Sequence, residues 1–178
     1  GKKRNNLFNS RNVKMDIREW TIKQIKNLIA NYDRLNRTEG GPFSRAESML
    51  ELERRAGGDF DGYDVTKVIL KIRDNTENEL VRYRDIWGHY FPEKPWTGNY
   101  SGRIVGRALH AAAYYCAINN LPIVTALVSQ ANGRVTDQAK QNMFDNAENW
   151  GVASGTNAAD FYEINITKLQ TLTSEKLP

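Results

Sequence analysis

The spacing of apolar and polar positions predicts helices along most of this chain. The first covers residues 17–37, where apolar side chains recur at the spacing of one helix face and Asp16 stands at the N-cap position. The apolar residues of this stripe are Ile17, Trp20, Ile25, Leu28, Ile29, Tyr32 and Leu35. Gly40-Gly41-Pro42 interrupts the pattern, so the helix is expected to end before it.

Two capping-box patterns, in which Ser or Thr is followed three residues later by Glu, predict further helix starts. Ser44 and Glu47 open a helix that stops at a pair of glycines. Thr76 and Glu79 open another, which carries a broad aromatic face and ends before Pro92. Both segments are therefore expected to be amphipathic helices that bury one side.

Four more helices are expected from the same periodicity. One begins at Asp64, and one covers 101–118 with Ser101 as its N-cap. The last two cover about 137–149 and about 157–173. The predicted architecture is therefore a multi-helix single domain.

One segment has the pattern of β-structure. The apolar run Leu121–Val128 is rich in β-branched residues, and the turn pair Asn132-Gly133 separates it from residues 134–136. We therefore expect a small β-hairpin, and the fold class is mainly α with that hairpin, an α+β arrangement with a winged-helix-like segment. A single globular domain is expected for residues 15–178.

The composition is that of a globular protein, with 40% apolar and 26% charged residues. No apolar window is as long as the roughly 18 residues that a membrane-spanning helix needs, so no membrane insertion is expected. Cys116 is the only cysteine, which precludes an internal disulfide and favours a reducing compartment. We expect a cytoplasmic protein, and no pattern in the sequence indicates its oligomeric state.

The positive charges are concentrated in two segments without acidic residues. Residues 1–14 have too little apolar content to fold alone and are either a disordered basic extension or an arm that follows nucleic-acid phosphates. The second segment, 94–136, is called the basic island, and its cations are Lys94, Arg103, Arg107 and Arg134. The net charge of +4 therefore has a local origin.

Common enzyme motifs are absent from the sequence. There is no glycine-rich phosphate loop, dinucleotide fingerprint, nucleophile elbow or His-Glu-x-x-His helix. His89, His110 and Cys116 are too few to form a zinc site without a carboxylate, and Cys116 lies on an apolar helix face where its thiol stays protonated. No cofactor is predicted, and no catalytic residue is identified by these motifs.

An acidic turn resembles a calcium loop in its spacing of carboxylates. Asp59, Asp61 and Asp64 lie close together around a glycine, but the glycine comes early and no Glu closes the loop. A capped surface loop is therefore favoured over a metal site, and no metal ligands are predicted.

The basic island is the strongest candidate for a function. On a helix over 101–118, Arg103 and Arg107 share one face and His110 lies one turn further. Guanidinium groups bind phosphate oxygens in pairs, and aromatic rings stack on bases. The predicted nucleic-acid-binding residues are Arg103, Arg107, His110, Arg134, Trp96 and Tyr100.

Other interpretations of the same residues remain open. The arginines could pair with carboxylates and only stabilise the fold. The chain could be a metal-assisted enzyme on a phosphorylated or nucleic-acid substrate, with His110 as base and the acidic turn on the metal. It could also be a protein-interaction module anchored by Trp87, Tyr90, Phe91 and Trp96, although rings at helical spacing usually belong to the core.

Residues 83–135 carry a local resemblance to a known family. Tyr83-Arg-Asp-Ile86, Val105-Gly-Arg-Ala-Leu109, Leu121-Pro-Ile-Val124 and Gly133-Arg-Val135 resemble the winged-helix half of DNA alkyltransferases and alkyltransferase-like proteins. That resemblance implies that Arg107 lies on a helix that enters a DNA groove. The family's Pro-Cys-His-Arg signature is replaced by Thr125-Ala-Leu-Val, so alkyl transfer to cysteine is not implied. The chain as a whole also resembles small proteins of phages and mobile elements.

Overall fold

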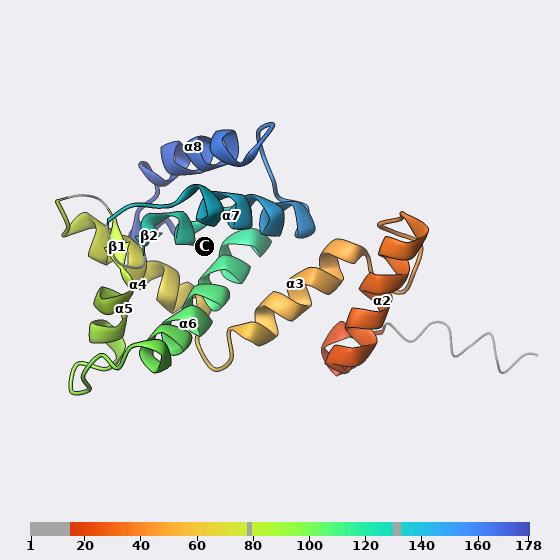
Figure 1. Cartoon of the computed structure of the whole chain (residues 1–178), viewed down its shortest axis with the longest axis horizontal. Coiled ribbons are helices and arrows are strands. Elements are labelled where there is room, and N and C mark those ends of the chain that lie inside the picture. The colour runs from red at the N-terminus through yellow and green to blue at the C-terminus, as the bar shows by residue number, and fades with distance from the viewer. Residues whose placement is uncertain (1–14, 78–79, 130–132) are drawn as a thin grey trace, which may run out of the picture. The chain divides into compact units, whose positions relative to one another are not determined.

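The computed structural model describes residues 15–77, 80–129 and 133–178. Over these residues the chain forms seven α-helices, three short 3-10 helices and one two-stranded sheet (Figure 1). In chain order the elements are η2 (Ile17–Glu19), α2 (Ile22–Leu35), α3 (Arg45–Ala56), α4 (Gly62–Asp74), β1 (Val81–Arg82), α5 (Tyr83–Tyr90), α6 (Asn99–Ile118), η3 (Val124–Leu127), β2 (Val128–Ser129), α7 (Asp137–Asn149), α8 (Ala158–Leu169) and η4 (Ser174–Lys176). The predicted class, mainly α with a small β element, is confirmed.

The chain forms two compact units, Gly1–Glu51 and Leu52–Pro178, whose boundary falls inside α3. The single domain expected for 15–178 stays a prediction, and the basic segment 1–14 lies outside the described residues. In the described part of the chain, every helix is too short or too polar to cross a lipid bilayer.

The first unit is organised by α2. Thr21 and Gln24 form a capping box at its start, and Ile25, Ile29 and Tyr32 are buried on one face. The continuous helix predicted from residue 17 is wrong, because Asp16 caps only the 3-10 turn η2 and Thr21 then restarts the chain as an α-helix.

Tyr32 also closes the loop that leads into α3. Its hydroxyl donates to the carbonyl of Phe43 and accepts from the backbone N–H of Gly41 at 2.9 Å. The predicted capping box of Ser44 and Glu47 is confirmed, with reciprocal hydrogen bonds of 3.0 Å at the start of α3. The hydroxyl of a buried tyrosine therefore supplies hydrogen bonds to two backbone groups of the loop that have no partner in a helix.

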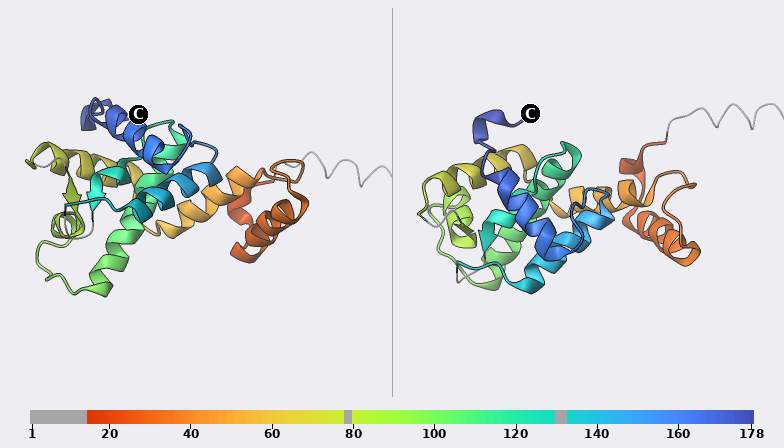
Figure 2. Two further views of the ribbon diagram at one scale, coloured as in Figure 1. Left: turned by 45° about the horizontal axis from the view of Figure 1, so that its top comes forward. Right: turned by 90° about the horizontal axis from the view of Figure 1, so that it is seen from above.

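The second unit is built on the contact between α4 and α6, while α7 and α8 lie side by side across it, as Figures 1 and 2 show. The buried residues of α6 are mostly small: Ser101, Val105, Ala108, Ala111, Ala112, Ala113, Cys116 and Ala117. Small side chains let helix backbones approach closely. The predicted burial of Cys116 is confirmed, since its side chain is fully enclosed.

A buried arginine joins α4 to the end of α8. The Arg73 guanidinium donates to the carbonyls of Leu169 at 2.7 Å and Leu172 at 2.8 Å, and it pairs with Asp74 at 3.0 Å. Carbonyls in the last turn of a helix have no partner within the helix. Arg73 therefore caps α8 from another element.

The predicted hairpin is wrong. The two strands are parallel and distant in sequence, with Val81 opposite Val128 and Arg82 opposite Ser129. Half of the apolar run 121–128 forms the 3-10 helix η3, residues 134–136 form no strand, and Asn132 lies outside the described residues. Thr136 accepts a hydrogen bond from the Ala139 backbone and caps α7, so the segment after the turn serves the next helix.

Three predicted helix starts are displaced. α4 begins at Gly62, and the Asp64 carboxylate instead accepts a hydrogen bond from the Tyr90 hydroxyl at 2.6 Å. α5 begins only at Tyr83, where Asp85 closes its first turn, and Glu79 of the expected capping box lies outside the described residues.

α6 begins at Asn99, two residues before the predicted cap. Ser101 is fully buried in its first turn, and its hydroxyl accepts from the backbone N–H of Thr97 at 2.9 Å. Gly98 allows the earlier start because its φ of 56° lies where other residues are strained.

Candidate nucleic-acid interface

Two exposed arginines lie one turn apart on α6. Arg103 and Arg107 both project from the side of the helix that is not packed in the core. Within the described residues neither guanidinium forms an ion pair with a carboxylate. The interpretation in which these arginines only neutralise acidic helices is therefore not supported by any contact in the described structure.

Arg103 lines an open groove of about 800 Å³ at the start of α6. Its other lining residues are Tyr83, Trp96, Gly98, Asn99 and Gly102. Trp96 and Arg103 were both singled out by sequence, and the fold brings them to one hollow. The groove thus combines a cation and a large ring, the two groups that bind the phosphates and bases of a nucleic acid.

The Trp96 ring is held in place by its neighbours. It packs edge-on against Trp87, with 6.2 Å between the two ring centroids. The guanidinium carbon of Arg84 lies 5.6 Å from the centroid of the Trp96 ring. Trp87 is itself buried and donates its indole N–H to the Lys94 carbonyl at 2.9 Å. Trp96 is therefore fixed to the core, with a second cation beside it.

Tyr100 lies next to the groove but is not part of its lining. Its ring meets Trp87 at 6.4 Å and remains 57% exposed. Burial of Trp87 also removes the central ring of the predicted protein-interaction patch, and Tyr90 is engaged by Asp64. The aromatic residues of this region mainly form core and groove.

His110, unlike Arg103 and Arg107, contacts a carboxylate in the described part of the chain. Its Nδ1 lies 2.7 Å from Oε1 of Glu53, a residue near the end of α3. This hydrogen bond raises the pKa of His110 above its usual value of 6.5, and partial burial opposes the increase. The expectation that no carboxylate accompanies the basic helix is wrong at this position, because α3 contributes one from outside the basic island.

The Glu53–His110 pair borders a second hollow, of about 190 Å³, between α6 and α7. Its remaining lining residues are Tyr83, Gly106, Leu109, Ala113, Ile123, Thr125, Met143, Asn146 and Trp150. Tyr83 lines both this hollow and the groove of Arg103. The two hollows thus share a wall.

Arg134 is exposed in the segment that precedes α7. No contact in the described residues joins it to Arg103 or Arg107, and the hairpin that was expected to present it is absent. Its contribution to phosphate binding stays a prediction.

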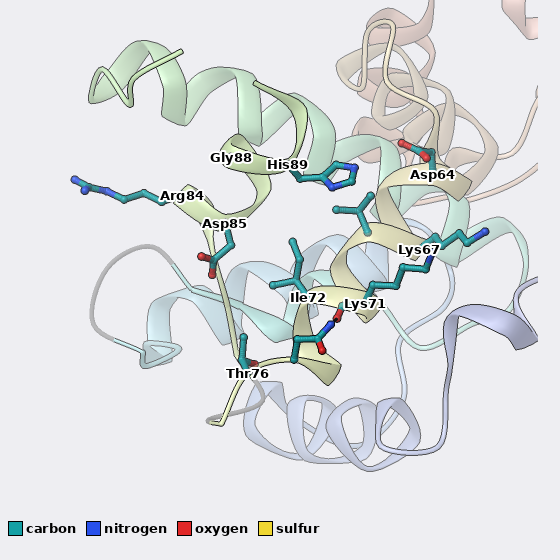
Figure 3. Close-up of a pocket in the computed structure, with 11 residues that line it drawn as sticks. Asp64, Lys67, Lys71, Ile72, Thr76, Arg84, Asp85, Gly88 and His89 are labelled. Carbon is teal, nitrogen blue, oxygen red and sulfur yellow. Dashed lines mark hydrogen bonds between the residues drawn. The ribbon is translucent and has the colours of Figure 1, made fainter. Parts of the chain in front are cut away.

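Another pocket, of about 640 Å³, lies between α4 and α5 (Figure 3). In Figure 3 Ile72 points into the gap and Arg84 points away from it. Its two carboxylates are engaged: Asp64 accepts from Tyr90, and Asp85 accepts from the Arg82 backbone at 3.0 Å. Lys67, Lys71 and His89 also line this pocket.

The acidic turn offers no assembled metal site. Among the described residues, no three His, Cys, Asp or Glu side chains are grouped to hold a metal ion. The Asp64 hydrogen bond and the burial of Tyr90 together raise the pKa of that tyrosine. Metal-assisted catalysis at this turn stays a prediction.

Sequence reasoning missed Glu53, Tyr83 and Arg84. Glu53 follows two other acidic residues on a charged helix, which gives no sign that it faces the basic island. Tyr83 and Arg84 were noted only as part of the motif Tyr83-Arg-Asp-Ile86, which indicated a helix and not a groove. Only the contact of Glu53 with His110 and the packing of α5 against α6 identify them.

Comparison with known proteins adds no relative. No protein-family model, curated protein or solved structure matches the chain. The resemblance to alkyltransferases therefore stays a prediction.

Proposed function

We propose that this chain binds nucleic acid, and that it holds a single strand along the exposed side of α6. The observation that carries the proposal is the groove in which Arg103 and Trp96 lie together, with no carboxylate pairing Arg103 in the described structure. A guanidinium in such a position is free to bind a phosphate.

Unpaired bases fit this arrangement better than a duplex. A single strand exposes the faces of its bases, and each base stacked on an aromatic ring contributes about 1–3 kcal/mol. Trp96 presents a ring beside the groove, already fixed by Trp87. Arg107, one turn beyond Arg103, would meet the next stretch of backbone.

The glycines of α6 support a path along the helix. A Cβ placed on Gly102 or Gly106 would meet no atom within 4 Å. The helix surface is therefore open at Gly102 and Gly106, the positions that precede Arg103 and Arg107, and a strand could lie there without displacing side chains.

The test is binding of the full chain to a fluorescent single-stranded oligonucleotide at several salt concentrations. Affinity should fall with salt, and Arg103→Ala should weaken binding and reduce the slope of log K against log salt by about 1, because one phosphate contact is lost. Trp96→Ala should cost about 1–3 kcal/mol and leave that slope unchanged, because stacking releases no counterion.

Arg37→Ala is the matched control, since Arg37 is an exposed arginine outside the groove and its removal changes the net charge equally. If Arg37→Ala and Arg103→Ala weaken binding to the same extent, the groove is not the binding site. Affinity that does not depend on salt would also contradict the proposal.

A further inference from the structure

The Glu53–His110 pair has the geometry of a general base. The Glu53 carboxylate engages Nδ1 of the imidazole at 2.7 Å, which leaves Nε2 as the nitrogen that can take a proton. Glu53 is only 14% exposed, whereas His110 is 50% exposed. An enclosed carboxylate thus orients an imidazole that solvent and ligands can reach, an arrangement that stabilises the imidazolium formed on proton transfer.

The position of the pair relative to the groove indicates what it could act on. Tyr83 lines both hollows, and Arg103 and His110 are separated by seven residues of α6, a rise of about 10 Å. A few linked nucleotides span that length. A strand held at Trp96 and Arg103 would therefore extend to His110.

A protein that cleaves RNA does not have to supply a nucleophile, because each ribose carries one in its 2′-hydroxyl. A site requires a way to hold the strand, a base next to a 2′-hydroxyl, and a cation for the charge that develops on phosphorus. The groove, the Glu53–His110 pair and Arg107, three residues before His110 on the same helix, correspond to these three requirements.

We propose that this chain cleaves bound single-stranded RNA with His110 as general base and Glu53 as the residue that positions it. The inference rests on the proposed nucleic-acid binding. Nε2 of His110 accepts the 2′-hydroxyl proton, and the 2′-oxygen forms a bond to the adjacent phosphorus. The bond from phosphorus to the 5′-oxygen breaks, and that oxygen takes a proton from solvent. His110 then releases the proton that it took from the 2′-hydroxyl to solvent. The products are a 2′,3′-cyclic phosphate and a 5′-hydroxyl.

The test incubates the full chain with an end-labelled RNA oligonucleotide and with DNA of the same sequence. RNA should be cut to fragments ending in a 2′,3′-cyclic phosphate, and DNA should bind without being cut because it has no 2′-hydroxyl. His110→Gln should lower the cleavage rate by about 100-fold or more, the usual contribution of a general base, with affinity retained. His89→Gln is the matched control, since His89 is the other histidine of the chain and is exposed on α5.

Glu53→Gln gives a readout that a purely structural role would not change. Glu53 and Tyr83 are the other titratable side chains that line the hollow, and Glu53 raises the pKa of His110. With glutamine in place of the carboxylate, the rise of cleavage rate with pH should move to lower pH, because the free base then forms at lower pH.

Three outcomes would overturn the inference. RNA that binds and stays intact would remove the cleavage reaction and leave the proposed binding function standing. Equal activity of the His110→Gln and His89→Gln variants would show that His110 is not the general base. A chain that binds neither RNA nor DNA would fail both proposals.

Discussion

The side-chain amide of Asn165 pairs with both backbone groups of Ile123. Its carbonyl oxygen accepts from the Ile123 N–H at 2.8 Å, and its NH2 group donates to the Ile123 carbonyl at 2.8 Å. Asn165 lies on α8 and is 5% exposed, while Ile123 immediately precedes η3. The Asn165 side chain thus makes the two hydrogen bonds that a neighbouring strand would otherwise make with the backbone of Ile123.

Asn165→Ala should destabilise the protein by about 1–3 kcal/mol, because it leaves the buried N–H of Ile123 without its partner. The Ile123 carbonyl loses one of two hydrogen bonds and keeps the one from the Ala126 N–H at 3.2 Å. Urea unfolding followed by circular dichroism would measure the change. Asn142→Ala removes an exposed amide that bonds only to Gln138, so its cost should be below about 0.5 kcal/mol. Equal effects of the two substitutions would contradict this role of Asn165.

Gly62→Ala should destabilise the contact between α4 and α6 by about 1–3 kcal/mol, the usual cost of an overpacked core. A Cβ on Gly62 would overlap the Ala111 carbonyl and lie 2.7 Å from Cβ of Tyr115. Gly88→Ala, in α5, meets nothing within 4 Å and should instead stabilise by about 0.5–1 kcal/mol, because alanine favours the helix. Thermal unfolding of the two variants should therefore shift in opposite directions.

Cys116 should not react with iodoacetamide in the native protein at pH 8. Burial raises the pKa of its thiol to about 11, so little thiolate is present, and the sulfur is enclosed beside Thr66. Mass spectrometry should find the thiol unmodified in buffer and fully modified in denaturant. Fast labelling of the folded chain would show that this part of α6 opens.

The stability that Glu53 contributes through His110 should depend on pH. The folded pKa of His110 is raised, so the contribution is complete below its ordinary pKa of 6.5 and is lost as the pH rises through the folded value. The melting temperature of wild type should exceed that of Glu53→Gln most below pH 6.5, and the difference should shrink as the pH rises through the raised pKa of His110. A difference that grows with pH would mean that the pair does not stabilise the imidazolium.

Local sequence patterns predicted most helices because they depend on neighbours a few residues away. The capping box of Ser44 lies where its pattern indicated, and Cys116 is buried on the apolar face of α6 where it was expected. The hairpin failed for the opposite reason. Pairing of Val81 with Val128 joins segments 47 residues apart, and the local turn signal at Gly133 carries no information about such a partner.

By itself, the sequence determined the helical class, the burial of Cys116 and the exposed arginine face of α6, since each follows from periodicity along one element. Tertiary structure alone decided which groups meet that face. It placed Glu53 against His110, Arg84 against Trp96, and Tyr83 between the two hollows. These contacts join residues far apart in the sequence, and helix packing follows the fit of whole surfaces, which no short stretch of sequence specifies.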